Sequence, residues 1–233
     1  MKNKEIIWSK RLNELLSISI FFELDFFLDA GTLLGFKRNK KFIEWDNDID
    51  LGLKYCKEIE NKVYSFILCL YKKGWNVSLS KFGITAITED VEINICFYRK
   101  SSLYWETQYY KYSTNNFLLI FLWTLKKGIY LDSFGYGLKF LIKRLLLKNK
   151  WVLILFHESL FKHFIKEEIK KVFIPAITFD NLVKEKFYGI NCWVPDKTEN
   201  YLSFRYGDSW REPRQKYNYF TEKSKIYQKN ENQ

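Results

Sequence analysis

The sequence has no run of ~18 uninterrupted apolar residues, the length that a helix needs to cross a bilayer, so a membrane-spanning helix is not expected. Its first residues also lack the apolar core of a secretory signal. The four cysteines form no C-x-x-C pair and lie in apolar stretches, at Cys56, Cys69, Cys96 and Cys192. We therefore expect buried free thiols rather than disulfides or zinc ligands, and a cytoplasmic protein.

Histidine is scarce, and recognised nucleic-acid motifs are absent. His157-Glu158 begins like the zinc motif H-E-x-x-H, but Phe161 stands where the second histidine is required. His163 does not share a helical face with His157, and we interpret both histidines as structural. No Arg-rich or RNP-like motif occurs, so nucleic acid is not among the expected partners.

Positive charge is abundant, with 38 lysines and arginines against 27 acidic residues and a net charge of +11. Such a surplus suits phosphorylated substrates, anionic lipid or nucleic acid. The 233 residues fit one large domain or a domain with an insertion, and a chain of this length can bury a core without disulfides.

Three aspartates alternate in the segment 46–53, at Asp46, Asp48 and Asp50. If this segment is a strand, the three carboxylates share one face, where like charges are costly without a cation. Hard divalent cations prefer carboxylate oxygens, so we predict that these aspartates bind Mg²⁺ or Mn²⁺. A solvated acidic loop is the alternative. A calcium loop is excluded, because Leu51 and Lys57 stand where it requires Gly and Glu.

A small-residue turn and a basic segment precede the aspartates. Gly31 can adopt backbone conformations closed to other residues, and Thr32 adds a hydroxyl beside exposed N–H groups. A helix starting near Thr32 would offer its free N–H groups to a phosphate, with Lys37 and Arg38 close behind. Together these features predict a phosphoryl-transfer site.

These residues resemble the signature of the LicD/fukutin-related phosphotransferases. The resemblance lies in the Gly-Thr-Leu-Leu-Gly segment 31–35, then Arg38, Ile43, Trp45 and the alternating aspartates. A second, ordered match lies about 150 residues further on, at Tyr201-Leu202, Tyr206-Gly207-Asp208, Trp210 and Pro213. The chain departs from the family at Glu44, where the family usually has proline.

The resemblance implies a nucleotidyltransferase-like α/β fold, a mixed sheet flanked by helices. It also implies transfer of a phospho-alcohol, such as phosphocholine or ribitol phosphate, from a CDP-linked donor to a glycan hydroxyl. That superfamily needs a third carboxylate from a neighbouring strand. Glu92 is the only acid in the alternating segment 91–98, so we predict it as ligand or general base, with Asn94 as the alternative occupant of that position. Arg205 and Asp208 are candidate substrate-binding residues, or else a helix cap and a surface charge.

Hydrophobic periodicity predicts the order of the elements. We expect helices over residues 6–22, 54–73 and 198–206, strands over 26–30, 46–53, 75–80, 83–88 and 91–98, and a strand with a short helix over 173–188. This order divides the chain into a catalytic core (1–100), a basic, aromatic, helical insertion (101–172), the C-terminal part of the catalytic domain (173–220) and a disordered tail (221–233).

The insertion contains cationic amphipathic stretches, most clearly over residues 137–150. Such a stretch is typical of a helix at a membrane surface, and equally of a core-facing helix in a lysine-rich protein. We regard the insertion as the candidate site for an acceptor glycan, including one linked to lipid at the inner face of the membrane.

Two other functions are compatible with the sequence. The first is a nucleotidyltransferase, which moves the nucleotide itself onto its acceptor. The second is a non-catalytic, basic module that binds a membrane surface or nucleic acid on the same scaffold.

Overall fold

The computed structural model describes residues 2–112, 134–135 and 167–215. The helices are α1 (Lys2–Phe21), α2 (Ala30–Asn39), the 3-10 turn η1 (Lys57–Ile59), α3 (Glu60–Lys72), α7 (Ala176–Phe179) and α8 (Thr198–Tyr206). The strands are β1 (Phe26–Leu28), β2 (Asp48–Lys54), β3 (Asn76–Ser80), β4 (Gly83–Ile87), β5 (Glu92–Ser101), β6 (Tyr104–Tyr112), β7 (Phe134–Gly135), β8 (Glu167–Pro175), β9 (Leu182–Phe187) and β10 (Ile190–Pro195).

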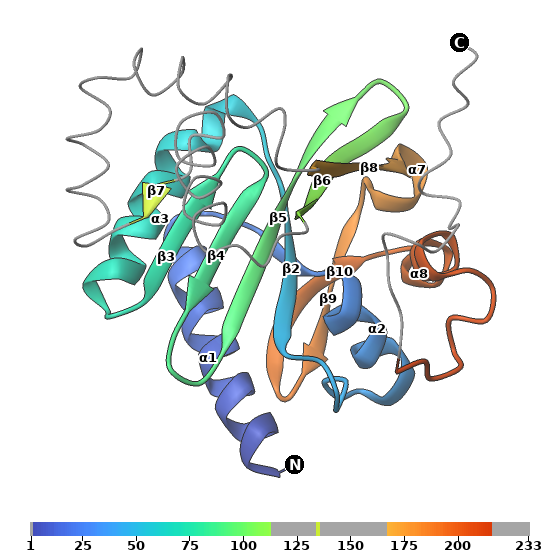
Figure 1. Cartoon of the computed structure of the whole chain (residues 1–233), viewed down its shortest axis with the longest axis horizontal. Helices are drawn as coiled ribbons and strands as arrows, with labels where there is room; N and C mark the ends of the chain where they lie inside the picture. Colours follow the sequence, from blue (N-terminus) through green and yellow to red (C-terminus); the bar gives the residue numbers. More distant parts are fainter. Residues whose placement is uncertain (1, 113–133, 136–166, 216–233) are drawn as a thin grey trace.

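The strands form one mixed sheet in the order β7-β3-β4-β5-β2-β1-β10-β9, and β6 and β8 extend it from β5 (Figure 1). β2 pairs in parallel with β5 and antiparallel with β1. β1 pairs in parallel with β10, so the segment after residue 167 completes the same sheet as the first hundred residues. The predicted α/β class, a mixed sheet flanked by helices, is confirmed.

Local sequence explains the elements next to β2. In β5, the apolar residues Ile93, Ile95 and Phe97 are buried, and the polar residues between them are partly exposed. α2 begins at Ala30 because the Asp29 side chain accepts a hydrogen bond from the Ala30 N–H, at 2.7 Å.

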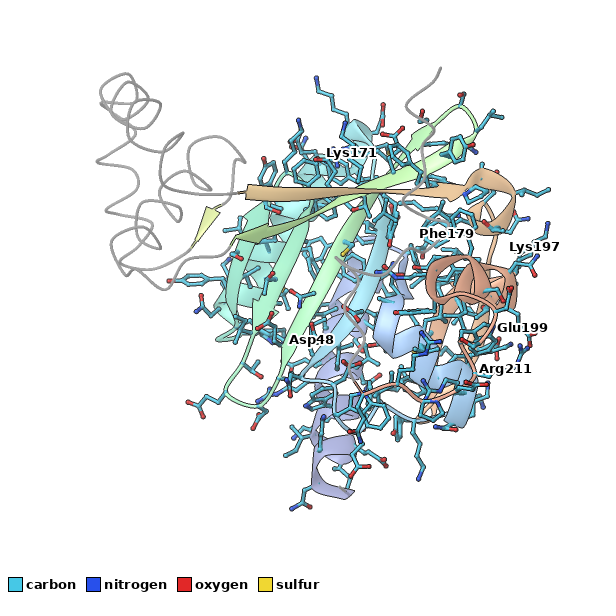
Figure 2. The ribbon with its side chains drawn as sticks, turned by 45° about the vertical axis from the view of Figure 1, so that its right-hand side comes forward. Asp48, Lys171, Phe179, Lys197, Glu199 and Arg211 are labelled. Atoms are coloured by element: carbon cyan, nitrogen blue, oxygen red, sulfur yellow. The ribbon has the colours of Figure 1, made fainter. Side chains whose placement is uncertain are left out.

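The helices lie in two groups. Figure 1 shows α1 and α3 together behind the strands, and α2 and α8 together beside β2 and β10. Aromatic side chains fill the space between the sheet and α8. Phe179, labelled in Figure 2, is fully buried and packs against the rings of Phe27, Tyr98 and Tyr201. The core therefore joins residues from both ends of the chain.

Several predicted boundaries need correction. β2 begins at Asp48, so Asp46 lies in the turn before the strand, and Lys54 ends β2 rather than starting a helix. The segment expected to be a helical insertion begins and ends as strands, because β6 and β8 pair with each other along their length. The amphipathic stretch 137–150, both histidines and the tail 221–233 lie outside the described residues.

The four cysteines are free, as predicted, although only Cys192 is buried and Cys56 is exposed. Within the parts of the chain given above, no helix is long and apolar enough to cross a membrane.

Candidate active site

A cavity of about 570 Å³ opens beside the acidic start of β2. Its walls come from α2 and the turn before β2, from the β3–β4 hairpin with β5, and from α8 with the segment that follows it. The polar and charged lining residues are Arg38, Asp46, Asp48, Asp50, Ser80, Thr85, Asn94, Gln108, Arg205, Tyr206, Ser209, Glu212, Arg214 and Gln215. The three predicted metal-binding aspartates therefore line one cavity.

Asp50 is held by the start of α2. The Gly31 N–H donates to its carboxylate at 3.0 Å, and the Asp50 N–H donates to the Thr32 hydroxyl at 2.8 Å. Thr32 is only 2% exposed and does not line the cavity. Gly31 and Thr32 therefore hold the acidic strand through these groups, and their role in seating a phosphate stays a prediction.

Glycine is needed at position 31 because a side chain there would collide with neighbouring carboxylates, and not because the backbone is left-handed. A Cβ atom at this position would lie 2.4 Å from Asp46 Oδ2 and 3.1 Å from Asp50 Oδ2. The left-handed conformation in this turn belongs to Ala30, with φ of 40°. The absence of a side chain at Gly31 thus allows two carboxylates to approach the same backbone atom.

The aspartates carry negative charge in a confined space. Burial and then the charge of Asp48 raise the pKa of Asp46 to about 6, against a smaller opposing effect of Lys4. Burial, followed by the charges of Asp48 and Asp29, raises the pKa of Asp50 well above its usual range. A bound cation would stabilise the ionised form of these groups, so their chemistry fits a divalent metal.

Across the residues that the structure describes, no three Asp, Glu, His or Cys side chains form a ready-made metal site. Mg²⁺ is usually held by one or two carboxylates together with substrate phosphates and water, rather than by a cage made only of protein. The aspartates therefore suit a metal that arrives with a phosphorylated ligand.

Of the two β5 residues predicted for the site, Asn94 lines the cavity, together with its neighbours Ile95 and Cys96, and Glu92 does not. Its amide nitrogen donates to Asp48 at 2.9 Å and to Glu92 at 3.0 Å, and its oxygen accepts from the Thr85 hydroxyl. In the sheet register Glu92 lies opposite Asp48, and Asn94 lies opposite Asp50. Glu92 thus contacts the acidic cluster through the Asn94 amide.

Behind the cavity, a buried cluster joins α2, β5 and α8. Asp29 is fully buried and accepts hydrogen bonds from the hydroxyls of Tyr98, at 2.6 Å, and Tyr201. Arg205, only 5% exposed, lies 3.6 Å from the Asp29 carboxylate and donates to the Tyr201 hydroxyl at 2.8 Å. Because the Asp29 N–H also donates to the Asp50 carbonyl at 3.2 Å, this cluster is linked directly to the acidic strand.

The other predicted substrate-binding residues divide into two groups. Arg38 and Arg205 line the cavity, although much of Arg205 is engaged in the buried cluster. Lys37 and Asp208 do not line it, and Asp208 is exposed.

Sequence reasoning did not identify the wall formed by the segment after α8. Among the described residues, two buried nitrogen donors near the cavity have no hydrogen-bond partner, Arg38 Nε and Trp210 Nε1. Arg214 lines the same wall. Trp210 stood in the second motif match, but only the fold brings it to the same cavity as Arg38.

One known protein family matches part of this chain. The family described as LicD/FKTN/FKRP, nucleotidyltransferase domain, matches residues 23–128, which include the acidic strand and its supporting turn. No curated protein gives a significant match.

Two solved structures of ANT(2'')-Ia resemble part of the chain. The solution structure of this antibiotic-resistance factor has a TM-score of 0.34 and 15% identity, and the match covers 42% of this chain and 50% of that one. The crystal structure in complex with adenylyl-2''-tobramycin has a TM-score of 0.32 and 15% identity, with 41% and 52% covered. Each match spans about half the length of that protein.

The acidic cluster lies on an α/β sheet, within the part of the chain that the family model matches. Residues 23–128 match the nucleotidyltransferase domain of the LicD/FKTN/FKRP family, which supports the family resemblance found in the sequence.

Proposed function

We propose that this protein is a metal-dependent phosphotransferase. It would move a phospho-alcohol, such as phosphocholine or ribitol phosphate, from a CDP-activated donor to a hydroxyl of a surface glycan. The observation that carries the proposal is one cavity lined by the carboxylates of Asp46, Asp48 and Asp50 and also by Arg38 and Arg214. The family supports the choice of donor and glycan.

Asp46, Asp48 and Asp50 would hold Mg²⁺ or Mn²⁺. The bound cation supplies positive charge against the donor diphosphate, whose oxygens gain negative charge as the phosphoryl group leaves. The raised pKa values of Asp46 and Asp50, which arise from burial and mutual repulsion, support this assignment.

The cationic and N–H donor groups of the cavity lining would orient the donor phosphates. Arg38 provides a fixed positive charge, and its Nε and the Trp210 Nε1 are buried donors that lack a partner. Unpartnered buried donors are costly, and an anionic ligand in this cavity could satisfy them after a small side-chain shift. Glu92 stays the predicted acceptor of the glycan hydroxyl proton, and its carboxylate accepts a hydrogen bond from the Asn94 amide of the cavity wall.

The location and the acceptor are also proposals. A net charge of +11 suits a cytoplasmic protein that contacts the inner face of an anionic membrane peripherally and meets a lipid-linked glycan there. The basic segment 101–172 remains the candidate for holding that glycan.

A thermal-shift panel tests the donor and the metal together. It contains CDP-choline, CDP-ribitol, CDP-glycerol, UDP-sugars and NTPs, each with Mg²⁺, Mn²⁺ or EDTA. A ligand at 100 times its dissociation constant stabilises the native state by about 2.7 kcal/mol, which raises the unfolding midpoint by a few degrees. We expect a metal-dependent shift with one CDP compound. No metal-dependent shift with any compound would contradict the proposal.

Asp48→Asn tests the acidic cluster with almost no change in side-chain volume. Turnover and the metal-dependent shift are expected to collapse, by about 100-fold or more, while the circular dichroism spectrum is unchanged. Glu89→Gln is the matched control, because it removes one charge from an exposed residue in the turn before β5, at the end of the strands where Asp48 pairs with Glu92. Turnover of Asp48→Asn within about threefold of wild type would rule out the metal centre.

The family description also favours a second candidate, nucleotidyl transfer. The reaction products separate the two, because the phosphotransferase releases CMP and a nucleotidyltransferase releases pyrophosphate. A basic binding module with no catalysis would instead keep its salt-sensitive affinity for anionic vesicles or DNA in the Asp48→Asn variant.

A further inference from the structure

The turn that carries Asp46 has few hydrogen bonds of its own. We call residues 40–47 the acid loop. Within it, the Asp46 N–H donates to the Ile43 carbonyl at 3.2 Å, and the Lys41 N–H reaches the Gly35 carbonyl at 3.4 Å. Asp46 is therefore placed largely by contacts from other parts of the chain.

The first turn of α1 supplies one of these contacts. Lys4 Nζ donates to the main-chain carbonyl of Glu44 at 3.1 Å and to that of Asp46 at 2.5 Å. One ammonium group thus bridges two carbonyls of the acid loop from 40 or more positions away in the sequence. In the described part of the chain, Lys4 forms no ion pair with a carboxylate side chain.

Packing fixes Lys4 in this position. Its ammonium group lies 4.1 Å from the centre of the Trp8 ring, and Trp8 is only 5% exposed. The Trp8 ring in turn packs edge-on against Phe42 of the acid loop, at 5.3 Å between centroids. Phe42 is anchored from the far side, where its N–H donates to the Tyr188 hydroxyl at 3.2 Å.

The contact between Lys4 and the acid loop also places a positive charge near the Asp46 carboxylate. The Asp46 carboxylate lies close to the Gly31 backbone and near the Asp48 charge. Both its burial and the repulsion from Asp48 favour movement of this carboxylate out of the cluster. A cation that holds the Asp46 main chain opposes this movement without occupying the carboxylate oxygens that face the cavity. The carboxylate thus stays available to a ligand.

We propose that Lys4 is a positioning residue of the active site, which clamps the acid loop so that Asp46 faces the metal site. Lys4 lies outside residues 23–128, the part of the chain that the family accounts for. The role of Asp46 as a metal ligand rests on the proposed function, whereas the clamp itself does not.

The test compares Lys4→Met, Lys4→Arg and Lys10→Met in the full chain. Lys10 is the matched control, because it lies on the same helix and is exposed. Two quantities are measured for each protein without donor. One is the hydrogen exchange of the amides of residues 41–47, and the other is the affinity for Mn²⁺ alone.

In Lys4→Met we expect exchange in residues 41–47 to accelerate about tenfold, with the rest of the sheet unchanged, and Mn²⁺ to bind about tenfold more weakly. Lys4→Arg keeps a cation that can lie over the Trp8 ring and donate to main-chain carbonyls, so it is expected to recover most of both losses. Lys10→Met is expected to match wild type in both measurements.

Wild-type exchange and wild-type Mn²⁺ affinity in Lys4→Met would overturn the inference. Faster exchange throughout the sheet would also overturn it, because Lys4 would then have only a general structural role. If wild-type protein binds no Mn²⁺ but Lys4→Met still loosens residues 41–47 alone, the clamp stands and the metal part of the proposed function fails.

Discussion

At Gly31 the backbone passes between two carboxylates, and the missing side chain sets how close they come. A Cβ atom there would overlap Asp46 Oδ2, at 2.4 Å, and crowd Asp50 Oδ2, at 3.1 Å. Neither contact can be relieved without moving a carboxylate that lines the cavity. The geometry of the acidic cluster therefore depends on the absence of a side chain at Gly31.

Gly31→Ala is expected to displace the Asp46 carboxylate and to weaken metal-dependent donor binding at least tenfold. The free energy of unfolding is expected to fall by about 1–3 kcal/mol, as for an overpacked site. Thermal shift measures the metal-dependent donor binding, and urea unfolding measures the free energy of unfolding.

The double variant Gly31→Ala/Asp46→Ala is the control, because it removes the carboxylate that the new methyl group would meet. We expect it to regain most of the lost stability but none of the binding. An unchanged metal-dependent shift in Gly31→Ala alone would show that the position of Asp46 does not matter for binding.

At the scale of elements, the contact between α8 and the start of α2 is polar and buried. Arg205 and Tyr201 of α8 meet Asp29, the residue that caps α2 and binds the Asp50 carbonyl. Burial raises the pKa of Tyr201 well above its usual range, so its hydroxyl remains a donor to Asp29. α8 thereby holds the turn on which the acidic strand rests.

Arg205→Met is expected to cost about 3–5 kcal/mol of unfolding free energy, because it leaves the Asp29 charge buried without its cationic partner. Asp29→Asn with Arg205→Met is expected to cost less than the sum of the two single changes, since the unpaired charge is then gone. Urea unfolding measures each value.

Arg211→Met is the matched control. Arg211 pairs with Glu199 at 2.6 Å, but both side chains are more than half exposed, and Figure 2 shows them at the outer edge of the molecule. Such a surface pair contributes about 0–1 kcal/mol, so this variant is expected to unfold nearly as wild type does. Equal losses in Arg205→Met and Arg211→Met would contradict the role of the buried cluster.

At the scale of the whole molecule, the domain is assembled from two distant segments. β1 lies between β2 and β10, and β10 follows the family-matched region by more than 60 residues (Figure 1). Without β10 and α8, β1 would present an unpaired edge, and the cavity would lose the wall that contains Arg205 and Trp210.

We therefore expect a fragment of residues 1–128, which ends with the family match, to lack a cooperative unfolding transition and near-ultraviolet circular dichroism. A fragment of residues 1–215 serves as its control and is expected to keep both. Cooperative unfolding of the shorter fragment would show that the first half folds independently of β10 and α8.

The sequence alone determined the features that depend on short-range patterns. Alternation placed Asp48 and Asp50 on one face of a strand and made the strand around Ile93 and Ile95 recognisable. The helix predicted over 198–206 is α8, and the first motif lies within the residues that match the LicD/FKTN/FKRP family. Each of these signals lies within a few residues, where backbone geometry sets which side chains point the same way.

The tertiary structure decided which distant residues meet. Asp46 lies in the turn before β2, and Arg205 is buried against Asp29. Asn94 rather than Glu92 lies in the cavity wall. The ends of the expected helical insertion are strands. The tertiary structure also brought Lys4 to the acid loop. These contacts join residues that are 40 to more than 170 positions apart, and only the packing of the sheet and its helices sets such distances.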